Sequence, residues 1–257
     1  MKSPRSYQRA ANELRPLSFE LHWQKHPDGS VLVSQGGTRV ICSVSVEETV
    51  PSFVKAKGTG EGWLTAEYGM LPSATHTRTR REVSEGKPSG RTHEIQRLIG
   101  RSLRAVVDCA ALGERTVRID CDVIEADGGT RCASITGAWV ALVLAQAKMR
   151  ARGLIVEPFI RDQIAALSVG IVQGEVLVDL DYSEDSQCDA DMNIIMTGNH
   201  RFVEIQATAE DQAFPKALFL NALSVAEEGI ARIQQAQKEA LDSVIRDQRS
   251  GIRNTVI

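Results

Sequence analysis

One stretch of the sequence, residues 119–145, joins an alternating strand pattern, a paired-glycine turn and a long apolar run. Ile119, Cys121 and Val123 alternate with Asp120 and Asp122, which predicts a half-buried strand. The glycine pair at residues 128–129 interrupts this pattern, and residues 133–144 are small and apolar enough to form a buried helix. The stretch therefore predicts a strand that passes through a glycine turn directly into a buried helix.

The paired glycines at the start of this predicted helix form a candidate anion site. Glycines let the backbone approach a ligand closely, and the free N–H groups and dipole of a helix N-terminus favour negative charge. Thr130 is the predicted N-cap, and Arg131 falls in the first turn, where a nearby anion would stabilise it. An ordinary turn is the alternative. Residues 36–39 repeat the same tetrapeptide before a β-branched run, and there the pattern predicts only a hairpin turn.

Length and composition are those of an ordinary globular protein, with 257 residues and a net charge of −3. We identify no apolar run of membrane-spanning length and no secretory signal at the N-terminus. The five cysteines are scattered and form no CxxC pair, which favours buried free thiols in a reducing compartment. We therefore expect a cytoplasmic protein with no membrane partner.

A basic segment lies between residues 76 and 104, although the chain as a whole is slightly acidic. It holds eight Lys and Arg side chains against three Glu, which indicates a polyanionic partner or an arginine-rich subunit interface. Residues 92–108 have the apolar spacing of an amphipathic helix, and Arg97, Arg101 and Arg104 share its other face. A solvated surface is the alternative for that face. Arg91 lies just before this helix, so a second arginine stands beside a predicted helix start.

An acidic segment, residues 181–191, leads into a predicted strand at residues 192–197. Carboxylates clustered at a strand edge are the hard oxygen ligands that Mg²⁺ prefers, and one with a raised pKa could act as a general acid. A solvated acidic loop is the alternative, but the basic segment around Arg91 favours a joint site for phosphates and a divalent ion. The five carboxylates are Asp181, Glu184, Asp185, Asp189 and Asp191.

Strands followed by helices occur twice along the chain, which predicts an α+β protein with two internally similar halves. The halves span about residues 15–110 and 114–248, and we find no linker between them, so we expect one domain over residues 1–257. The five histidines lack zinc-type spacing, and neither a GxSxG elbow nor a P-loop is present. The sequence thus argues against zinc enzymes, serine hydrolases and P-loop proteins.

Three long motifs resemble those of the ribonuclease PH family, the bacterial phosphate-dependent exoribonucleases that trim the 3′ ends of transfer RNA. They are SGRTHEIQRLIGRSLRAVVD, IDCDVIEADGGTRCASITGA and YSEDSQCDADMNIIMTG, and shorter matches are ELRPL, GEGWLTAEYGMLP and FVEIQATAE. The resemblance extends from Arg15 to about Ile233. It implies the ribonuclease PH fold, an α+β fold of the ribosomal protein S5 domain 2-like type with two duplicated βαβ-like halves, and a homohexameric ring built as a trimer of dimers.

The resemblance also implies a site. Inorganic phosphate would be the co-substrate and would be held by a first set of residues. Mg²⁺ would be the cofactor, and it would be associated with an acidic pair that also serves acid catalysis. The phosphate residues would be Arg91, Gly129, Thr130 and Arg131, and the acidic pair Asp185 and Asp191.

Four further arginines are candidates for contacts between subunits or with RNA. The loop that carries Arg78 and Arg81 resembles the ring-interface loop of the family, and Arg97 and Arg101 are candidates for RNA binding or for the interface. One departure is visible, because Ser73 stands where many members have an arginine. This difference bears on the stability of the ring and not on the chemistry.

The activity implied by the resemblance is 3′→5′ phosphorolysis. Phosphate attacks the last phosphodiester of a transfer RNA precursor beyond its CCA end, and a nucleoside diphosphate leaves. Such a tRNA nucleotidyltransferase can add nucleotides in reverse and can take part in ribosomal RNA processing. Two alternatives are a hydrolytic, metal-dependent nuclease and a non-catalytic ring subunit that only binds RNA. Relatives of the second kind tend to lose the phosphate arginines or the acidic pair, whereas this sequence retains both.

Overall fold

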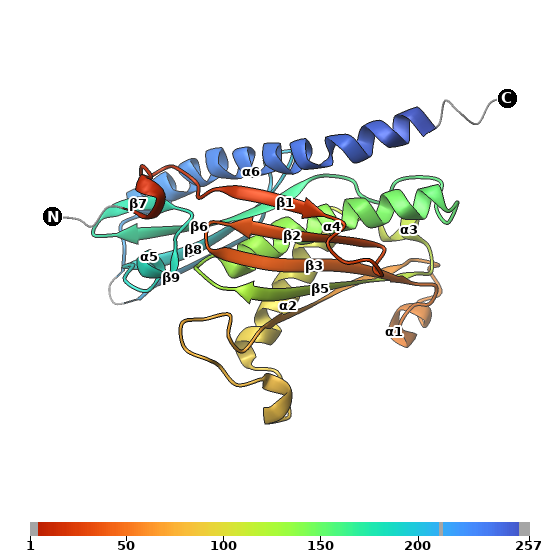
Figure 1. The fold of residues 1–257 in the computed structure, drawn as a ribbon, viewed down its shortest axis with the longest axis horizontal. Helices are drawn as coiled ribbons and strands as arrows, with labels where there is room; N and C mark the ends of the chain where they lie inside the picture. The colour runs from red at the N-terminus through yellow and green to blue at the C-terminus, as the bar shows by residue number, and fades with distance from the viewer. Residues whose placement is uncertain (1–4, 211–212, 252–257) are drawn as a thin grey trace.

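The alternating strands of the first half build a five-stranded sheet. Its strands are β1 (Leu17–Leu21), β2 (Gly29–Gln35), β3 (Thr38–Glu47), β4 (Trp63–Met70) and β5 (Thr116–Glu125). The computed structural model describes residues 5–210 and 213–251 (Figure 1). The strand order is β1-β2-β3-β5-β4, with β4 parallel to β5 and the other neighbours antiparallel. Gly36 turns the chain between β2 and β3 at a φ of 58°, so the predicted hairpin is confirmed.

A second sheet has four strands, all paired antiparallel. They are β6 (Ile164–Val172), β7 (Glu175–Val178), β8 (Ala190–Thr197) and β9 (Phe202–Ala209). The order is β7-β6-β8-β9, so the central strands β6 and β8 have neighbours on both sides. Both central strands are almost entirely buried, and most of their residues are apolar.

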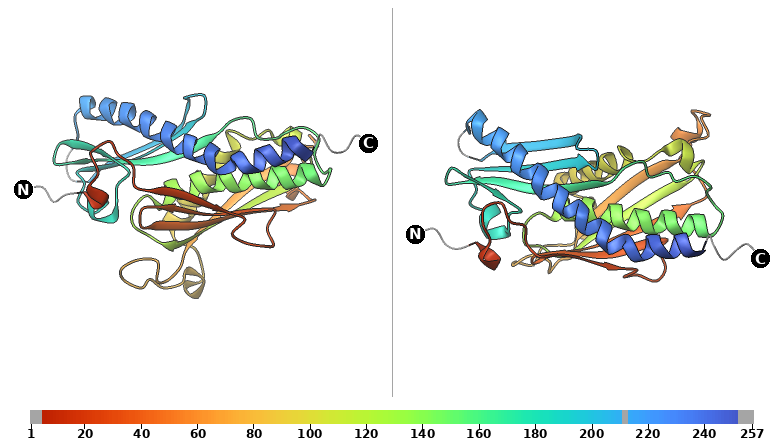
Figure 2. Two further views of the ribbon diagram at one scale, coloured as in Figure 1. Left: turned by 45° about the horizontal axis from the view of Figure 1, so that its top comes forward. Right: turned by 90° about the horizontal axis from the view of Figure 1, so that it is seen from above.

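Helix α4 (Thr130–Ala151) lies between the two sheets. It packs against β2 and β3 on one side and against β6 and the long helix α6 (Lys216–Gly251) on the other. Helix α6 runs across the second sheet and continues beside α4 (Figure 2). Helix α2 (Gly90–Arg104) covers β4 and touches α4. The remaining helices are short: α1 (Ser52–Lys55), α3 (Cys109–Leu112), α5 (Tyr182–Asp185) and the 3-10 turns Ser6–Gln8 and Glu82–Glu85.

By length and composition alone, α4 could cross a membrane, which corrects the expectation that no apolar run reaches that length. The 22-residue helix has an 18-residue window with a mean hydropathy of 1.3, and 78% of that window is buried inside the protein. Small residues bring α4 close to the first sheet, since a Cβ on Gly137 would lie 2.7 Å from Val33 Cγ1. The apolar composition of α4 therefore reflects its place as the core helix that both sheets share.

The α+β class is confirmed, but the internal boundary differs from the predicted one. The prediction puts residues 116–125 in the second half, whereas β5 completes the first sheet between β3 and β4. Helix α2 carries the chain from β4 back to a parallel neighbour, so β4, α2 and β5 form a βαβ unit. Because the second sheet is antiparallel in its three pairings, the predicted βαβ character applies to the first half only.

Helix α2 begins at Gly90, two residues earlier than predicted. The Ser89 hydroxyl caps it by accepting a hydrogen bond from Thr92 N at 3.1 Å. Arg91 consequently lies in the first turn and not before the helix. Arg91 and Arg131 are each the second residue of a helix, where the helix dipole disfavours a cation.

The contact between β2 and α4 yields a test of this packing. A Cβ on Gly29 would lie 2.0 Å from Ala141 O and 2.7 Å from Ala145 N, both backbone atoms of α4. We expect Gly29→Ala to lower the free energy of unfolding by about 1–3 kcal/mol or more, because α4 must shift away from the sheet. Gly90→Ala is the control, since nothing lies within 4 Å of its added Cβ. Equal stability of the two variants in chemical denaturation would contradict this packing.

Candidate active site

A cleft of about 430 Å³ opens between the turn after β5, the start of β8, α5 and the first turn of α2. The loop at residues 75–79 contributes a further wall. Six residues predicted from the sequence to hold phosphate or to act as the acidic pair all line this cleft. They are Arg91, Gly129, Thr130, Arg131, Asp185 and Asp191. Residues from both halves of the chain therefore meet in one cavity, and the roles assigned to them stay predictions.

The paired glycines form the floor of the cleft because other residues would not fit there. Gly128 and Gly129 have φ angles of 75° and 66°, in the left-handed region that L side chains rarely adopt. A Cβ on Gly128 would also lie 2.4 Å from Leu180 O. This turn starts α4 at Thr130, and the N–H groups of the first helical turn have no acceptor within the helix. The turn therefore exposes backbone donors to the cleft.

The predicted N-cap is wrong, because Gly129 and not Thr130 occupies that position. The Thr130 hydroxyl instead lies 2.9 Å from Tyr68 Oη, in a buried contact that ties the start of α4 to β4. Thr130 is thus already inside the helix. Its side chain fixes the orientation of the first turn, while its N–H group remains a donor at the cleft.

The first copy of the repeated tetrapeptide supports the second, a contact that sequence reasoning missed. The Thr38 hydroxyl accepts a hydrogen bond from Asp127 N at 2.9 Å and donates one to Gly128 O at 2.6 Å. Gly37 is needed beside it, since a Cβ there would lie 2.7 Å from Asp127 Oδ2. The hairpin turn between β2 and β3 therefore braces the turn that opens α4.

Two arginines face the cleft from different helices. Arg131 Nη1 donates to Gln206 Oε1 at 2.9 Å and lies 3.7 Å from Glu94 Oε1. Arg91 is exposed, and its Nη1 lies 3.9 Å from Met70 Sδ, a weak acceptor. Both guanidinium groups thus retain donors for an anion at the mouth of the cleft.

Two carboxylates share the cleft with these arginines. Asp185 ends the short helix α5, and Asp191 is the second residue of β8. Burial within the cleft walls raises the pKa of Asp185, and the negative charge of Asp191 adds to the increase. The positive charges of Arg131 and Arg91 act on the pKa of Asp185 in the opposite direction. The cleft thus combines a carboxyl group that holds its proton more tightly with two cations.

The carboxylate pair fits a divalent cation of the Mg²⁺ type. Mg²⁺ is commonly bound through one or two carboxylates together with substrate phosphates, and Asp185 and Asp191 supply such a pair next to the arginines. Their mutual repulsion, seen in the raised pKa of Asp185, would be relieved by a cation. In the part of the chain that the structure describes, no group of three or more His, Cys, Asp or Glu side chains is arranged to hold a metal ion alone.

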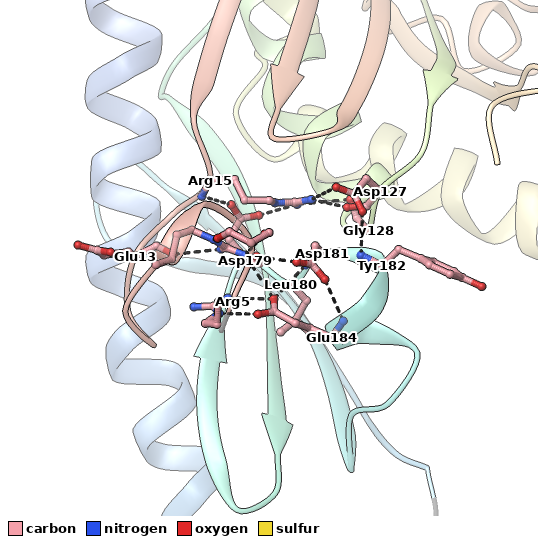
Figure 3. Close-up of polar contacts among 12 residues, drawn as sticks. Arg5, Glu13, Arg15, Asp127, Gly128, Asp179, Leu180, Asp181, Tyr182 and Glu184 are labelled. Carbon is pink, nitrogen blue, oxygen red and sulfur yellow. Dashed lines mark hydrogen bonds and ion pairs between the residues drawn. The ribbon is translucent and has the colours of Figure 1, made fainter. Parts of the chain in front are cut away.

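A buried ion pair joins the parts of the chain that build the cleft (Figure 3). Arg15 Nη2 donates to Asp179 Oδ1 at 2.7 Å, and Arg15 N donates to Asp179 Oδ2 at 2.7 Å. Arg15 also donates through Nη1 to Asp127 O, and through Nη2 to Gly128 O at 3.4 Å. The segment before β1 thereby links the glycine turn to the segment after β7.

The segment that carries Asp185 is held by a second set of contacts. Asp181 caps α5, since its side chain accepts from Glu184 N while the Glu184 side chain accepts from Asp181 N. Arg5 Nε donates to Glu184 Oε1 at 2.5 Å, and Tyr182 N donates to Asp127 Oδ1 at 3.2 Å (Figure 3). These contacts fix α5 against the glycine turn, although neither Arg5 nor Asp127 was a candidate from the sequence.

The other predicted arginines lie outside the cleft lining. Arg78 and Arg81 are exposed in the connection between β4 and α2, residues 71–89, which projects from the body of the protein (Figure 1). Arg97 is exposed on α2, and Arg101 on the same helix forms a bidentate pair with Glu204 of β9, with Nη2 2.7 Å from Oε2. Their roles in RNA binding or in an interface stay predictions.

Fold and cleft together define a class of protein. Two sheets share a core helix, and a cleft of arginines, a helix N-terminus and carboxylates opens where the sheets meet. This arrangement is that of an α+β protein with the ribonuclease PH fold.

Comparison with known proteins identifies the family. The model of the 3′ exoribonuclease family matches with its domain 1 at residues 13–148 and with its domain 2 at residues 162–229. The chain therefore belongs to the 3′ exoribonuclease, or ribonuclease PH, family. The first match includes β5 and all but the last residues of α4, in agreement with the boundary between the two sheets.

Two solved structures share the fold. Rice (Oryza sativa) Rrp46 superposes with a TM-score of 0.74 at 17% identity, covering 92% of this chain and 100% of that one. A chain of the Archaeoglobus fulgidus exosome with RNA bound to the active site also has a TM-score of 0.74, at 22% identity, covering 90% of this chain and 91% of that one. At these identities the likeness concerns the fold alone.

The buried ion pair predicts a strong effect on stability. We expect Arg15→Met and Asp179→Asn each to lower the free energy of unfolding by about 3–5 kcal/mol, because each leaves a buried charge or dipole without its partner. The loss of unfolding free energy in the double variant should be smaller than the sum of the losses in the two single variants. Glu125→Gln is the control, since it breaks the exposed pair with Arg39 and should cost less than about 1 kcal/mol. Similar losses for buried and exposed pairs would contradict the assignment.

The raised pKa of Asp185 predicts that Asp185→Asn increases the stability of the fold by an amount that depends on pH. Because the folded state holds this proton more tightly than the unfolded state, stability falls as the pH rises through the interval between the two pKa values, and the loss persists above it. Thermal unfolding of Asp185→Asn should therefore occur at a higher temperature than that of the wild type at about pH 7, with a smaller gain near pH 4. Asp189→Asn is the control for removing one charge from the same segment. A lower unfolding temperature for Asp185→Asn at pH 7 would refute the sign of the shift.

Proposed function

We propose that the protein is a phosphorolytic 3′→5′ exoribonuclease. The observation that carries this proposal is the shared cleft, where Arg91 and Arg131 meet the start of α4 and the Asp185–Asp191 pair. Membership of the 3′ exoribonuclease family supports RNA as the substrate. The substrate proposed in the cell is a transfer RNA precursor with nucleotides beyond its CCA end, and ribosomal RNA processing is a second role.

The chemistry follows from charge and position. Orthophosphate binds at the N–H groups of the first turn of α4, between the guanidinium groups of Arg131 and Arg91. One of its oxygens attacks the phosphorus of the last phosphodiester of the RNA, and the bond from that phosphorus to O3′ of the preceding nucleotide breaks. The terminal residue leaves as a nucleoside diphosphate. Because one phosphate ester is exchanged for a diphosphate, the reaction runs in reverse when nucleoside diphosphates are abundant.

The arginines and backbone donors act on charge that develops during this displacement. They are already aimed into the cleft, so little reorganisation is needed at the moment of reaction. The leaving O3′ requires a proton, and Asp185 is the better candidate to supply it because burial and Asp191 raise its pKa. Asp185 and Asp191 would also hold Mg²⁺, which when bound supplies positive charge to the phosphate oxygens.

The wider context of the reaction is part of the same proposal. We expect a homohexamer, a trimer of dimers, in which the projecting loop with Arg78 and Arg81 contributes to the contacts between subunits. Arg97 and Arg101 would contact RNA or a neighbouring subunit. A cytoplasmic location is supported by the five cysteines, which are free thiols in the described structure.

Two alternatives make different products. A hydrolytic nuclease would release nucleoside monophosphates without phosphate, and a non-catalytic ring subunit would bind RNA and release nothing. The likeness to rice Rrp46 and to a chain of the archaeal exosome is the reason to test the ring subunit as an alternative. The retained arginines and aspartates of the cleft favour the enzyme.

Product identity distinguishes these functions. A 3′-extended transfer RNA is incubated with Mg²⁺, with and without inorganic phosphate, and the nucleotides released are separated. The proposal requires nucleoside diphosphates that form only with phosphate. Monophosphates formed without phosphate would establish hydrolysis, and stable binding without any product would establish the non-catalytic subunit.

The phosphate arginines yield a further prediction. We expect Arg91→Ala and Arg131→Ala each to slow phosphate-dependent trimming by about 100-fold or more, because each removes a preorganised cation from the reacting phosphate. RNA binding should survive in part. Arg150→Ala is the matched control, since Arg150 is an exposed arginine in the last turn of α4, opposite the end that carries Arg131. Unchanged phosphorolysis by both cleft variants would rule out the assignment.

A further inference from the structure

Two aromatic side chains line the cleft, and the phosphoryl chemistry makes no use of them. Tyr182 and His76 both belong to the cleft lining, with ring centroids 5.2 Å apart and planes inclined at 54°. Tyr182 is 50% exposed, and His76 is exposed as well. An aromatic ring that leaves half its surface to solvent beside a phosphate-type cleft has an unused apolar face.

The position of Tyr182 is fixed relative to the reacting groups. It is the first residue of α5 and Asp185 is the last, so their side chains are three residues apart on one helical turn. Its backbone N–H donates to Asp127 Oδ1 at 3.2 Å, which ties Tyr182 to the turn that opens α4 (Figure 3). Tyr182 therefore lies on the same helical turn as the carboxylate that would protonate O3′, and both residues line the cleft.

The loop that carries His76 is also held by backbone hydrogen bonds on either side of His76. The loop is already joined to the turn after β5 by a hydrogen bond from Ala126 N to Ala74 O at 2.8 Å. It is closed on itself by Thr79 N donating to Pro72 O at 2.8 Å. His76 thus lies on an anchored segment, where its ring enlarges the aromatic surface that Tyr182 presents to the cleft.

We propose that Tyr182, with His76 beside it, is the stacking platform for the nucleobase of the 3′-terminal nucleotide. This inference rests on the proposed function and names how the same site receives its RNA. Stacking on an aromatic ring tolerates every base, because each base has a π-face, and thus suits an enzyme that removes successive nucleotides of any sequence. The scissile phosphodiester then lies next to the orthophosphate held by the arginines, while the terminal base is held by the ring.

Fluorescence of a terminal base analogue tests the platform without catalysis. A short RNA that ends in 2-aminopurine is titrated with protein in the absence of phosphate. Stacking on Tyr182 should quench the fluorescence in the wild type and in Tyr182→Phe, which keeps the ring. Tyr182→Leu should lose most of the quenching and bind the RNA roughly 5- to 100-fold more weakly. Trp23→Leu removes an exposed aromatic side chain outside the cleft and is the matched control.

A change in the RNA separates stacking from a loss of folding. Wild-type protein should bind RNA with an abasic 3′-terminal residue roughly 5- to 100-fold more weakly than the normal RNA. For the abasic RNA, Tyr182→Leu should cause little further loss. Equal quenching by wild type and Tyr182→Leu, or equal affinity of the wild type for both RNAs, would overturn the platform.

The proposed function fails in a different way from the platform. If wild-type protein releases no nucleoside diphosphate from RNA and phosphate, phosphorolysis is wrong whatever the fluorescence shows. If it releases diphosphates and Tyr182→Leu leaves both the quenching and the KM for RNA unchanged, phosphorolysis stands and the platform is refuted. In the supported case, KM for RNA rises in Tyr182→Leu and returns in Tyr182→Phe.

Discussion

The cleft depends on the buried ion pair between Arg15 and Asp179. Both side chains are 1% exposed, so each charge would be costly to bury without the other. Burial lowers the pKa of the Arg15 guanidinium, but the charge and hydrogen bonds of Asp179 outweigh it and the pKa is raised. Asp179 also accepts from Gln35 Nε2 at 2.9 Å, which satisfies its oxygens further. Three segments distant in sequence are thereby fixed to one another, and the cleft lies at their junction.

The cleft combines charges of both signs. Two arginines at helix N-termini are placed where the dipole disfavours them, and two carboxylates are close enough to raise the pKa of one. A bound anion would offset the unfavourable interaction of the arginines with the helix dipoles. A proton or a divalent cation would offset the repulsion between the carboxylates. Glu94 and Gln206 keep the Arg131 guanidinium oriented without occupying all of its donors. A phosphate ester and a cation together therefore complement the cleft better than either alone.

Features encoded within short stretches of sequence were predictable. The strand, glycine turn and helix at residues 119–145, the hairpin at residues 36–37 and the acidic segment at residues 181–191 all follow local patterns, and the structure brings the predicted residues into one cleft. The pattern S-G-R at residues 89–91 also carried a cap signal at Ser89, which places Arg91 inside the helix. Local chemistry was thus sufficient to choose the glycine turn and the arginines beside it, whereas the choice of Asp185 and Asp191 among the five carboxylates came from the family resemblance.

Features that depend on contacts between distant segments were not predictable from the same patterns. Strand order decides that β5 joins the first sheet, and the periodicity of β5 carries no information about its neighbours. Thr38 and Arg15 bond to the glycine turn from 89 or more residues away, so their roles emerge only when the sheets pack. The capping box of Asp181 and Glu184, by contrast, is a local contact whose spacing is present in the sequence, although we did not predict it.

The account rests on a phosphate seat at the tip of α4, and locating a bound ion tests it most directly. A crystal structure of the protein grown with inorganic phosphate should show the ion within hydrogen-bonding distance of the first-turn N–H groups of α4 and of the Arg91 and Arg131 guanidinium groups. Phosphate bound only elsewhere, with this part of the cleft filled by water, would contradict the account.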